Sequence, residues 1–428
     1  MSRSNVRAQA AILSIVLAGA FLIMATNTAV AAQVGDYTYT VSADKATITG
    51  YSGAGGDITI PSSLGGYPVV AIGDRAFHGS TLITAVTIPE GIMSIGPSAF
   101  RSCTALTSVT IPDSVTSIGS SAFEQSTSLT SIVFGQGVAA IGNYAFYGCS
   151  ALSSVTIPAS LTSIGSLVFT PCTSLISITV AASNVNYASV DGVLYNKDLT
   201  TLIQYPGGKT GAFVVPEDVV SIERYAFYKC NSIASVTIPD NVTSIGFDAF
   251  AGCAALDGIT VAAGNANYAS VDGVLYNRTF TTLVQHPGGK AGAFTIPNSV
   301  TSIAWDAFWS CAELTSVTMP DGITSIYSFT FQYCTSLTSV NFGNGVVSIG
   351  GFAFWGCTSL TSVIVPDGLA SIGAYAFAQT SIVSFTVKEN VTLIEDAPFY
   401  SCAALNDIVV WPATRTMRAW TACCTTRT

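Results

Sequence analysis

The stretch that decides the fold is Cys103-Thr-Ala-Leu-Thr-Ser-Val-Thr-Ile-Pro-Asp-Ser-Val-Thr-Ser-Ile-Gly-Ser-Ser-Ala-Phe-Glu-Gln125, a unit of 23 residues. Within it, Leu106, Val109 and Ile111 have the spacing of a short strand that sends alternate side chains inward. Pro112 then ends the strand, because proline has no N–H to donate to a sheet. The return half of the unit adds further inward residues, which are predicted to be Val115, Ile118, Ala122 and Phe123.

The same unit recurs along most of the chain. Its Ala-Phe or variant pair places the phenylalanine at positions 77, 100, 123, 146, 169, 227, 250, 308, 331, 354, 377 and 399. The spacing is 23 residues except for two intervals of 58, which equal 23 plus 35, and a last interval of 22. Such a period indicates a solenoid in which each coil is stabilised by its neighbours. We therefore predict stacked parallel strands in about twelve 23-residue coils, with short turn or 3₁₀ corners and two 35-residue insertions.

The repeat resembles the BspA-like class of leucine-rich repeats. The shared motif is Leu-x-x-Val-x-Ile-Pro-x-x-Val-x-x-Ile-Gly-x-x-Ala-Phe-x-x-Cys, and it covers roughly residues 69–405. The resemblance implies a β-rich leucine-rich repeat solenoid in a secreted or cell-surface protein that recognises a protein or glycan ligand, as adhesins do. The alternative is a structural component of a surface layer or matrix, without a specific ligand.

The two ends of the chain differ from the repeats. Residues 1–31 have a basic start, an apolar stretch and a small-residue cleavage site, which predicts a signal peptide, with an uncleaved N-terminal anchor as the alternative. After residue 32 no apolar run is long enough to span a membrane. Alternating residues within 32–68 predict a hairpin and an N-terminal β cap for the solenoid, which itself extends over residues 69–410.

Residues 411–428 no longer follow the repeat. A shifted reading frame that starts on the last base of the Val410 codon is compatible with text nearly identical to residues 261–277. The codons of Trp411 and Trp420 fix two positions of that text. We therefore predict a frameshifted, disordered tail, in which Cys423 and Cys424 have no role.

The insertions, residues 181–215 and 262–296, are near copies. The stretch from Asn186 to Asn196 recurs without change as residues 267–277. Apolar residues on either side of 196–198 predict a hairpin that projects from the coil and ends at Pro206-Gly207-Gly208. Two interpretations stay open: the insertions are docking lobes, because insertions in solenoids often lie on a binding face, or they are structural spacers.

Most cysteines form a column three residues after the repeat phenylalanine. Serine or threonine replaces cysteine at Ser80, Ser126 and Thr380, which leaves Cys103 and Cys402 without an adjacent thiol. This favours a structural column of small buried side chains over disulfides, although neighbouring coils are close enough for bonding. The column comprises Cys103, Cys149, Cys172, Cys230, Cys253, Cys311, Cys334, Cys357 and Cys402.

Composition argues against several function classes. The formal net charge is -9, and the 15 Lys and Arg residues are dispersed, so no basic stripe for nucleic acid is expected. The two histidines, His78 and His286, are predicted to lie in surface turns and belong to no catalytic triad. No Cys-x-x-Cys pair or histidine accompanies the cysteine column, so no metal is expected. We expect no enzymatic activity, cofactor or nucleic-acid partner.

Aromatic residues beside the Ala-Phe corners are the candidates for ligand contact. Large aromatic side chains on a surface often anchor interfaces. The alternative is that these rings stack on each other as a half-buried cover. The candidate ligand-binding residues are Tyr225, Tyr228, Trp305, Trp309, Tyr333 and Trp355, with Tyr195 and Tyr276 of the insertions.

Overall fold

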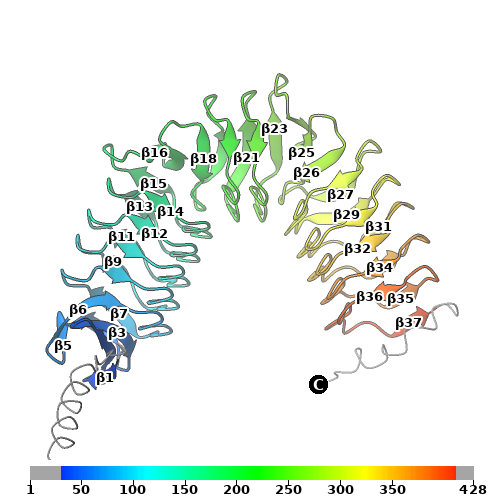
Figure 1. The fold of residues 1–428 in the computed structure, drawn as a ribbon. Coiled ribbons are helices and arrows are strands. Elements are labelled where there is room, and N and C mark those ends of the chain that lie inside the picture. The colour runs from blue at the N-terminus through cyan, green and yellow to red at the C-terminus, as the bar shows by residue number, and fades with distance from the viewer. Residues whose placement is uncertain (1–29, 411–428) are drawn as a thin grey trace, which may run out of the picture.

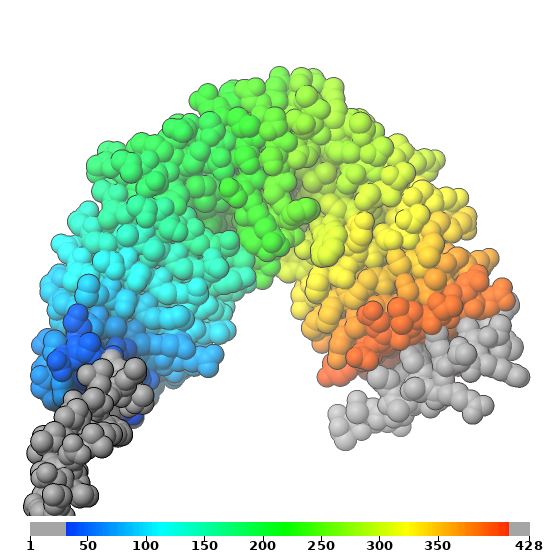
Figure 2. Space-filling view, in the orientation of Figure 1, coloured from blue at the N-terminus to red at the C-terminus, as the bar shows by residue number. Residues whose placement is uncertain are grey.

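The computed structural model describes residues 30–410, which form an arched solenoid (Figure 1). The space-filling view shows one continuous body from the N-terminal to the C-terminal coils (Figure 2). No α-helix occurs between residues 30 and 410. The predicted fold class is therefore confirmed, with about 16 turns instead of twelve.

Each coil contributes a longer strand, which follows the cysteine column. Within several separate sheets, neighbouring strands of this kind pair in parallel, and Ser108 lies opposite Ser131, one repeat further along the chain. They are β4 (Gly56–Thr59), β7 (Ile83–Thr87), β9 (Ser108–Thr110), β11 (Ser131–Val133), β13 (Ser154–Ile157), β15 (Ser177–Val180), β19 (Gly211–Val214), β21 (Ile233–Ile238), β23 (Gly258–Val261), β27 (Gly292–Thr295), β29 (Leu314–Thr318), β31 (Ser339–Asn341), β33 (Ser362–Ile364), β35 (Ser384–Val387) and β37 (Asp407–Val410).

The return half of each coil contributes a second, mostly shorter strand, which ends before the corner. Parallel pairing again joins equivalent residues, such as Ile118 and Ile141. These strands are β6 (Tyr67–Ile72), β8 (Ser94–Ile95), β10 (Ser117–Ile118), β12 (Ala140–Ile141), β14 (Ser163–Ile164), β18 (Thr201–Gln204), β20 (Ser221–Ile222), β22 (Ser244–Ile245), β26 (Thr282–Gln285), β28 (Ser302–Ile303), β30 (Ser325–Ile326), β32 (Ser348–Ile349), β34 (Ser371–Ile372) and β36 (Leu393–Ile394).

The repeat phenylalanines stack along the interior of the solenoid. The ring centroids of Phe100 and Phe123 are 5.2 Å apart, as are those of Phe123 and Phe146. Each of these rings is fully buried. Because rings such as Phe100 and Phe123 pack against the rings of two neighbouring coils, a coil does not bury its interior alone.

At the N-terminal end, an antiparallel meander covers the first coil. It consists of β1 (Val30–Val34), β2 (Tyr37–Ser42) and β3 (Lys45–Tyr51), and β3 pairs in parallel with β6, beside which lies β5 (Ser63–Leu64). The rings of Tyr37 and Tyr51 pack on Phe77. The predicted signal peptide lies outside the described residues apart from its last two positions, and the predicted tail, 411–428, lies wholly outside them.

The cysteine column is structural in its contacts. The nine side chains each place Sγ against a main-chain carbonyl of the preceding coil. The Sγ of Cys103 donates to the Phe77 carbonyl over 3.2 Å, and the Ser126 hydroxyl makes the equivalent bond to Phe100. Burial raises the pKa of Cys103 to about 12, which keeps the thiol protonated and able to donate.

The insertions form coils of their own. In the first, β16 (Tyr187–Val190) and β17 (Val193–Asn196) make a hairpin, β17 pairs antiparallel with β18, and β18 pairs in parallel with β20. The hairpin turn is Asp191-Gly192, whose φ values of 50° and 79° suit a two-residue turn. In the second, β24 (Tyr268–Val271) and β25 (Val274–Asn277) repeat this arrangement.

The hairpin predicted around residues 196–198 is thus present between β17 and β18, but the prediction that it projects from the coil is wrong. The main chain hydrogen-bonds to the strands on either side, because Ile178 N donates to Gly192 O over 2.8 Å and β18 joins β20. Each insertion is a wedge between coils, and the two wedges lie on either side of β21 and β23 at the crown of the arch (Figure 1).

The wedges divide the interior into three hydrophobic clusters. In β17, Leu194 belongs to the N-terminal cluster, whereas Val193 and Tyr195 belong to the middle one. In β25, Leu275 belongs to the middle cluster, and Val274 to the C-terminal one. Alternate side chains of one strand therefore face different cores.

Candidate ligand-binding site

The inserted coils have shorter corners than the ordinary coils. Leu283 of β26 pairs with Ile303, and His286 stacks on Phe308 at 5.1 Å, so these residues occupy equivalent positions. The path from Leu283 to His286 is three residues, whereas that from Ile303 to Phe308 is five. The missing two residues leave a gap between the ordinary corners on either side of each inserted coil.

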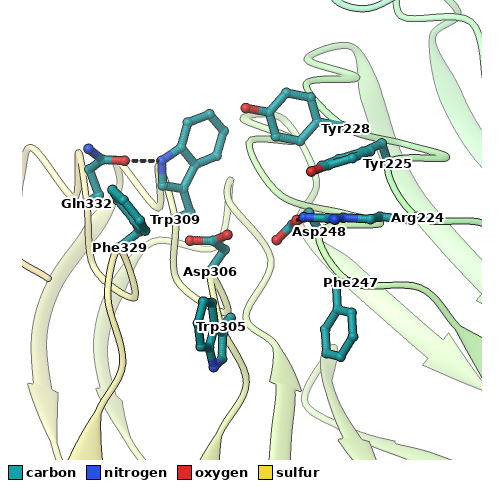
Figure 3. Close-up of a pocket in the computed structure, with 10 residues that line it drawn as sticks. All are labelled: Arg224, Tyr225, Tyr228, Phe247, Asp248, Trp305, Asp306, Trp309, Phe329 and Gln332. Atoms are coloured by element: carbon teal, nitrogen blue, oxygen red, sulfur yellow. Dashed lines mark hydrogen bonds and ion pairs between the residues drawn. The ribbon is translucent and has the colours of Figure 1, made fainter. Parts of the chain in front are cut away.

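A pocket of about 670 Å³ lies at the gap of the second insertion. Its walls come from corners on both sides of the inserted coil (Figure 3). The residues that line it are Arg224, Tyr225, Tyr228, Phe247, Asp248, Trp305, Asp306, Trp309, Phe329 and Gln332.

One wall is a pair of aromatic rings that bridges the gap. Trp309 stacks on Tyr228 with a centroid distance of 5.4 Å and an interplanar angle of 15°. The corner between them carries Gly252, where a Cβ atom would lie 2.4 Å from Cζ3 of Trp309. Glycine therefore makes room for the indole, and the Trp309 Nε1 donates to Gln332 Oε1 over 2.7 Å, which fixes its orientation.

The opening is bordered by exposed aromatic side chains. Trp305 is 56% exposed and Phe247 is 71% exposed, and the two lie on opposite sides of the pocket (Figure 3). Phe329, which is 36% exposed, belongs to the next corner. Flat apolar surfaces of this size, left open around a hollow, are typical of binding sites.

Polar groups converge between these rings. Arg224 pairs with Asp248 through Nη2 and Oδ2 at 3.0 Å. Asp306 faces Asp248 (Figure 3), and burial together with the hydrogen bond and charge of Asp248 raises the pKa of Asp306 to about 8. At neutral pH the Asp306 carboxyl therefore keeps its proton, and its O–H donates a hydrogen bond to the Asp248 carboxylate. With the positive charge of Arg224 balancing Asp248, these three groups carry almost no net charge.

A smaller pocket of about 260 Å³ lies at the gap of the first insertion. Unlike the larger pocket, it includes residues of the inserted coil among its walls. It is lined by Ile164, Gly165, Ser166, Leu167, Tyr187, Leu194, Ile203, Gln204, Glu223, Arg224 and Tyr225. Arg224 and Tyr225 thus line both pockets, one on each side of their corner.

Tyrosine hydroxyls cover the strand edges that the insertions interrupt. The hydroxyl of Tyr187 accepts a hydrogen bond from the main-chain N–H of Ile164 at the end of β14. The hydroxyl of Tyr268 does the same for Ile245 at the end of β22. These donors of the interrupted sheet are therefore occupied, although neither strand has a further strand beside it.

The structure separates the predicted candidates into three groups. Four of them, Tyr225, Tyr228, Trp305 and Trp309, line the larger pocket. Tyr333 and Trp355 lie beyond it and continue a row of ring contacts, with centroid distances of 6.5 Å from Trp309 to Tyr333 and 6.3 Å from Tyr333 to Trp355. The rings therefore also contact one another, as the alternative interpretation expected.

Tyr195 and Tyr276 are corrections to the sequence prediction. Both side chains are buried, at 1% and 2% exposure, because β17 and β25 are enclosed between two hydrophobic clusters. They are core residues and have no surface to offer a ligand.

His286 is a second correction. It was expected in a surface turn, but its side chain is 1% exposed and takes the place of a repeat phenylalanine. Burial lowers the pKa of His286 to about 4, so the imidazole is neutral at physiological pH. His78, by contrast, is exposed as expected.

The polar half of the pocket was not predicted from the sequence. Arg224, Asp248, Asp306 and Gln332 received no assignment, although a signal was present. Asp248 and Asp306 each stand two residues before a repeat phenylalanine, which is the corner position that Tyr225 also occupies. At all three positions the main chain is left-handed, with φ between 56° and 65°.

Two further features bear on the kind of site. Between residues 30 and 410, no three His, Cys, Asp or Glu side chains are grouped so as to hold a metal ion. Nor does that part of the chain contain a helix long and apolar enough to cross a membrane.

Comparisons with known proteins identify relatives of the whole solenoid. The model of the BspA type leucine rich repeat region matches residues 70–191, 207–273 and 290–406 in six copies. A leucine rich cell surface protein from Faecalibacterium prausnitzii is 33% identical with a TM-score of 0.53, and the match covers 89% of this chain and 94% of that one. A leucine-rich repeat protein from Eubacterium ventriosum is 25% identical with a TM-score of 0.46, covering 82% and 94%. No curated protein matches the chain.

Proposed function

Because the chain belongs to the BspA-type leucine-rich repeat family, we propose that it is a secreted or cell-surface protein that binds an extracellular protein or glycan through the larger pocket. The observation that carries the proposal is that four aromatic candidates line one open pocket together with an arginine and two aspartates. The related Faecalibacterium protein is described as a cell surface protein, which supports the extracellular location.

The geometry of the pocket suits binding. Hot spots of interfaces are enriched in Trp, Tyr and Arg, and they cluster in the centre of a contact area. Tyr228, Trp309 and Gln332 hold one another through stacking and a hydrogen bond, so the wall needs little ordering when a ligand arrives.

The second candidate is a structural role in a surface layer or matrix. It is favoured by the row of corner aromatics that contact each other along the solenoid, which would stabilise the chain without any ligand.

The full-length chain, screened against extracellular matrix proteins and arrayed glycans, should separate the two candidates. Specific binding that the Trp305→Ala variant loses would support the pocket. The matched control is Tyr400→Ala, which removes an aromatic ring that is 51% exposed on a corner far along the chain from the pocket. Ordered self-assembly in electron micrographs, with no ligand bound, would favour the structural role instead.

A further inference from the structure

We infer that the two pockets together bind a neutral polysaccharide chain, which passes from the smaller pocket over the corner of Arg224 and Tyr225 into the larger one. This inference rests on the proposed function and names the chemical class of its ligand.

The first argument is the combination of surfaces in the larger pocket. Trp305, Phe247 and Phe329 present flat apolar faces around the opening. A pyranose ring has one comparable face, made of C–H groups, and a rim of hydroxyl groups. Stacking on the aromatic side chains would bury the C–H face, and the polar groups inside the pocket would form hydrogen bonds with the hydroxyl groups.

The second argument is the hydrogen-bonding capacity of the pocket floor. Arg224 supplies only donors, the Asp248 carboxylate only acceptors, and the Gln332 amide both. A sugar hydroxyl donates one hydrogen bond and accepts others, so it needs this mixture. A purely apolar ligand would displace water from Asp248 and Arg224 without replacing its hydrogen bonds, which disfavours binding.

The third argument is charge. Arg224 and Asp248 are already paired at 3.0 Å, and Asp306 is protonated at neutral pH. A cationic or anionic ligand would have to separate the ion pair to find a partner, which leaves the other charge unpaired in a partly buried place. A neutral ligand avoids that cost. The Nζ of Lys229 lies 5.5 Å from the ring centroid of Tyr228 and 5.2 Å from that of Trp309. These two rings therefore already have a cation from the protein itself.

The fourth argument disfavours a peptide. A peptide that binds as an added strand obtains its affinity from main-chain hydrogen bonds to an open sheet edge. At the two gaps, the hydroxyls of Tyr187 and Tyr268 already bind the N–H groups of Ile164 and Ile245. These two N–H groups are therefore not available to a peptide that binds as an added strand.

The ligand is inferred to be a polymer because the two pockets lie on either side of one corner and share two lining residues. Arg224 and Tyr225 line both, and the guanidinium of Arg224 lies 4.4 Å above the Tyr225 ring, which gives the connecting corner a flat surface. A single sugar would leave one pocket empty. We expect binding without hydrolysis, because Asp306 and Asp248 hydrogen-bond to each other, whereas paired glycosidase carboxyls stand about 5 Å or more apart.

The test is calorimetry of the full-length chain with linear neutral hexasaccharides, namely β-1,4-glucose, β-1,4-mannose and α-1,4-glucose oligomers, and with the corresponding disaccharides. We expect at least one hexasaccharide to bind about tenfold more tightly than its disaccharide, because it fills both pockets. Trp305→Ala should weaken both ligands by about tenfold or more, and Tyr400→Ala should change neither.

The smaller pocket is tested with Ser166→Phe, which places at its rim the residue type that Phe247 provides at the larger pocket. Ser166 is exposed, so the bulkier side chain fits without disturbing the core. Because Phe247 offers a stacking face at the larger pocket, an aromatic ring at the equivalent rim position should tighten hexasaccharide binding by about threefold and leave the disaccharide affinity unchanged. Circular dichroism of each variant verifies its fold.

Three results would overturn the inference. The first is that none of the oligosaccharides binds, while a protein ligand binds and is lost in Trp305→Ala; the proposed function then stands and the ligand class is wrong. The second is equal affinity for hexasaccharide and disaccharide, which would contradict the inference that one polysaccharide chain fills both pockets. The third is a loss of binding in Tyr400→Ala as large as that in Trp305→Ala, which would show that the pocket is not the binding site.

Discussion

The two insertions share a sequence and differ in what surrounds them. Residues 186–196 and 267–277 are identical, and the two segments form the same strands with the same register. Yet the pocket at the first is about 260 Å³ and that at the second about 670 Å³. The difference comes from the flanking corners, where Ser166 and Leu167 at the first insertion correspond to Phe247 and Asp248 at the second. The short corner of each insertion creates the gap, and the ordinary coils on either side determine which side chains line it.

The largest effect should come from the shared framework. Asn265 is fully buried; its Nδ2 donates to the carbonyls of Pro239 and Val242, and its Oδ1 accepts from two main-chain N–H groups. Asn184 makes the same four bonds in the first insertion. Asn265→Ala and Asn184→Ala should each lower the free energy of unfolding by roughly 4 kcal/mol, because buried groups lose their partners.

Urea denaturation followed by circular dichroism measures these losses. Asn298→Ala, at an exposed position, serves as the control and should change stability by less than about 0.5 kcal/mol. A large effect in one insertion and a small one in the other would show that their frameworks are not equivalent.

The second effect distinguishes Tyr205 from His286, which occupy the same place in the two inserted coils. Folding lowers the His286 pKa from 6.5 to about 4, so the unfolded chain binds more protons between these values. The contribution of His286 to the free energy of unfolding is therefore fully present above pH 6.5. It is lost as the pH falls toward 4, by on the order of 3 kcal/mol. His286→Tyr should remove this loss.

Thermal unfolding of both proteins at pH 7 and pH 4.5 tests the prediction. Asp306, whose raised pKa acts with the opposite sign over the same range, is present in both proteins and cancels in the comparison. If wild type and His286→Tyr lose the same stability on acidification, His286 is not the responsible group.

The third effect concerns the room that the larger pocket requires. Gly252 and Gly79 stand at the same corner position with the same φ of 72°, but a Cβ atom would contact Trp309 only at Gly252. Gly79→Ala should cost about 1 kcal/mol for the left-handed conformation alone. Gly252→Ala should cost about 2–3 kcal/mol, because Trp309 must also move. Equal losses in denaturant titrations would mean that Trp309 is free to shift.

The smallest effect is on the proton that the two aspartates of the larger pocket share. Asp248→Asn removes the negative charge that helps to raise the Asp306 pKa, so that pKa should fall while remaining above 3.8, because the burial persists. Carbon-13 NMR titration of the carboxyl groups measures it, with the exposed Asp74→Asn as the control. An unchanged Asp306 pKa would show that burial alone raises it.

The repeat period predicted the solenoid, because inward residues must recur in every coil that packs on the next. It did not predict the burial of Tyr195 or His286. Tyr195 lies in a strand with a hydrophobic cluster on each face, so the usual alternation of inside and outside does not apply. His286 is polar, but its position is set by the Phe308 ring beneath it.

The polar half of the pocket was beyond sequence reasoning for a different reason. Asp248 and Asp306 are separated by 58 residues, and they meet only because the inserted coil between them has a short corner. The corner of the inserted coil could be recognised as short only after Leu283 and His286 were seen to be equivalent to Ile303 and Phe308. The aromatic candidates were found because their residue type alone attracts attention.

The division of the interior into three clusters has a mechanical consequence. A solenoid with one unbroken core transmits load from coil to coil until the whole stack gives way, whereas each cluster here can open as a cooperative block of its own. When it is pulled from its two ends, the arch should therefore unfold in three separate force-induced events. The boundaries between the three unfolding blocks should lie at β17 and β25.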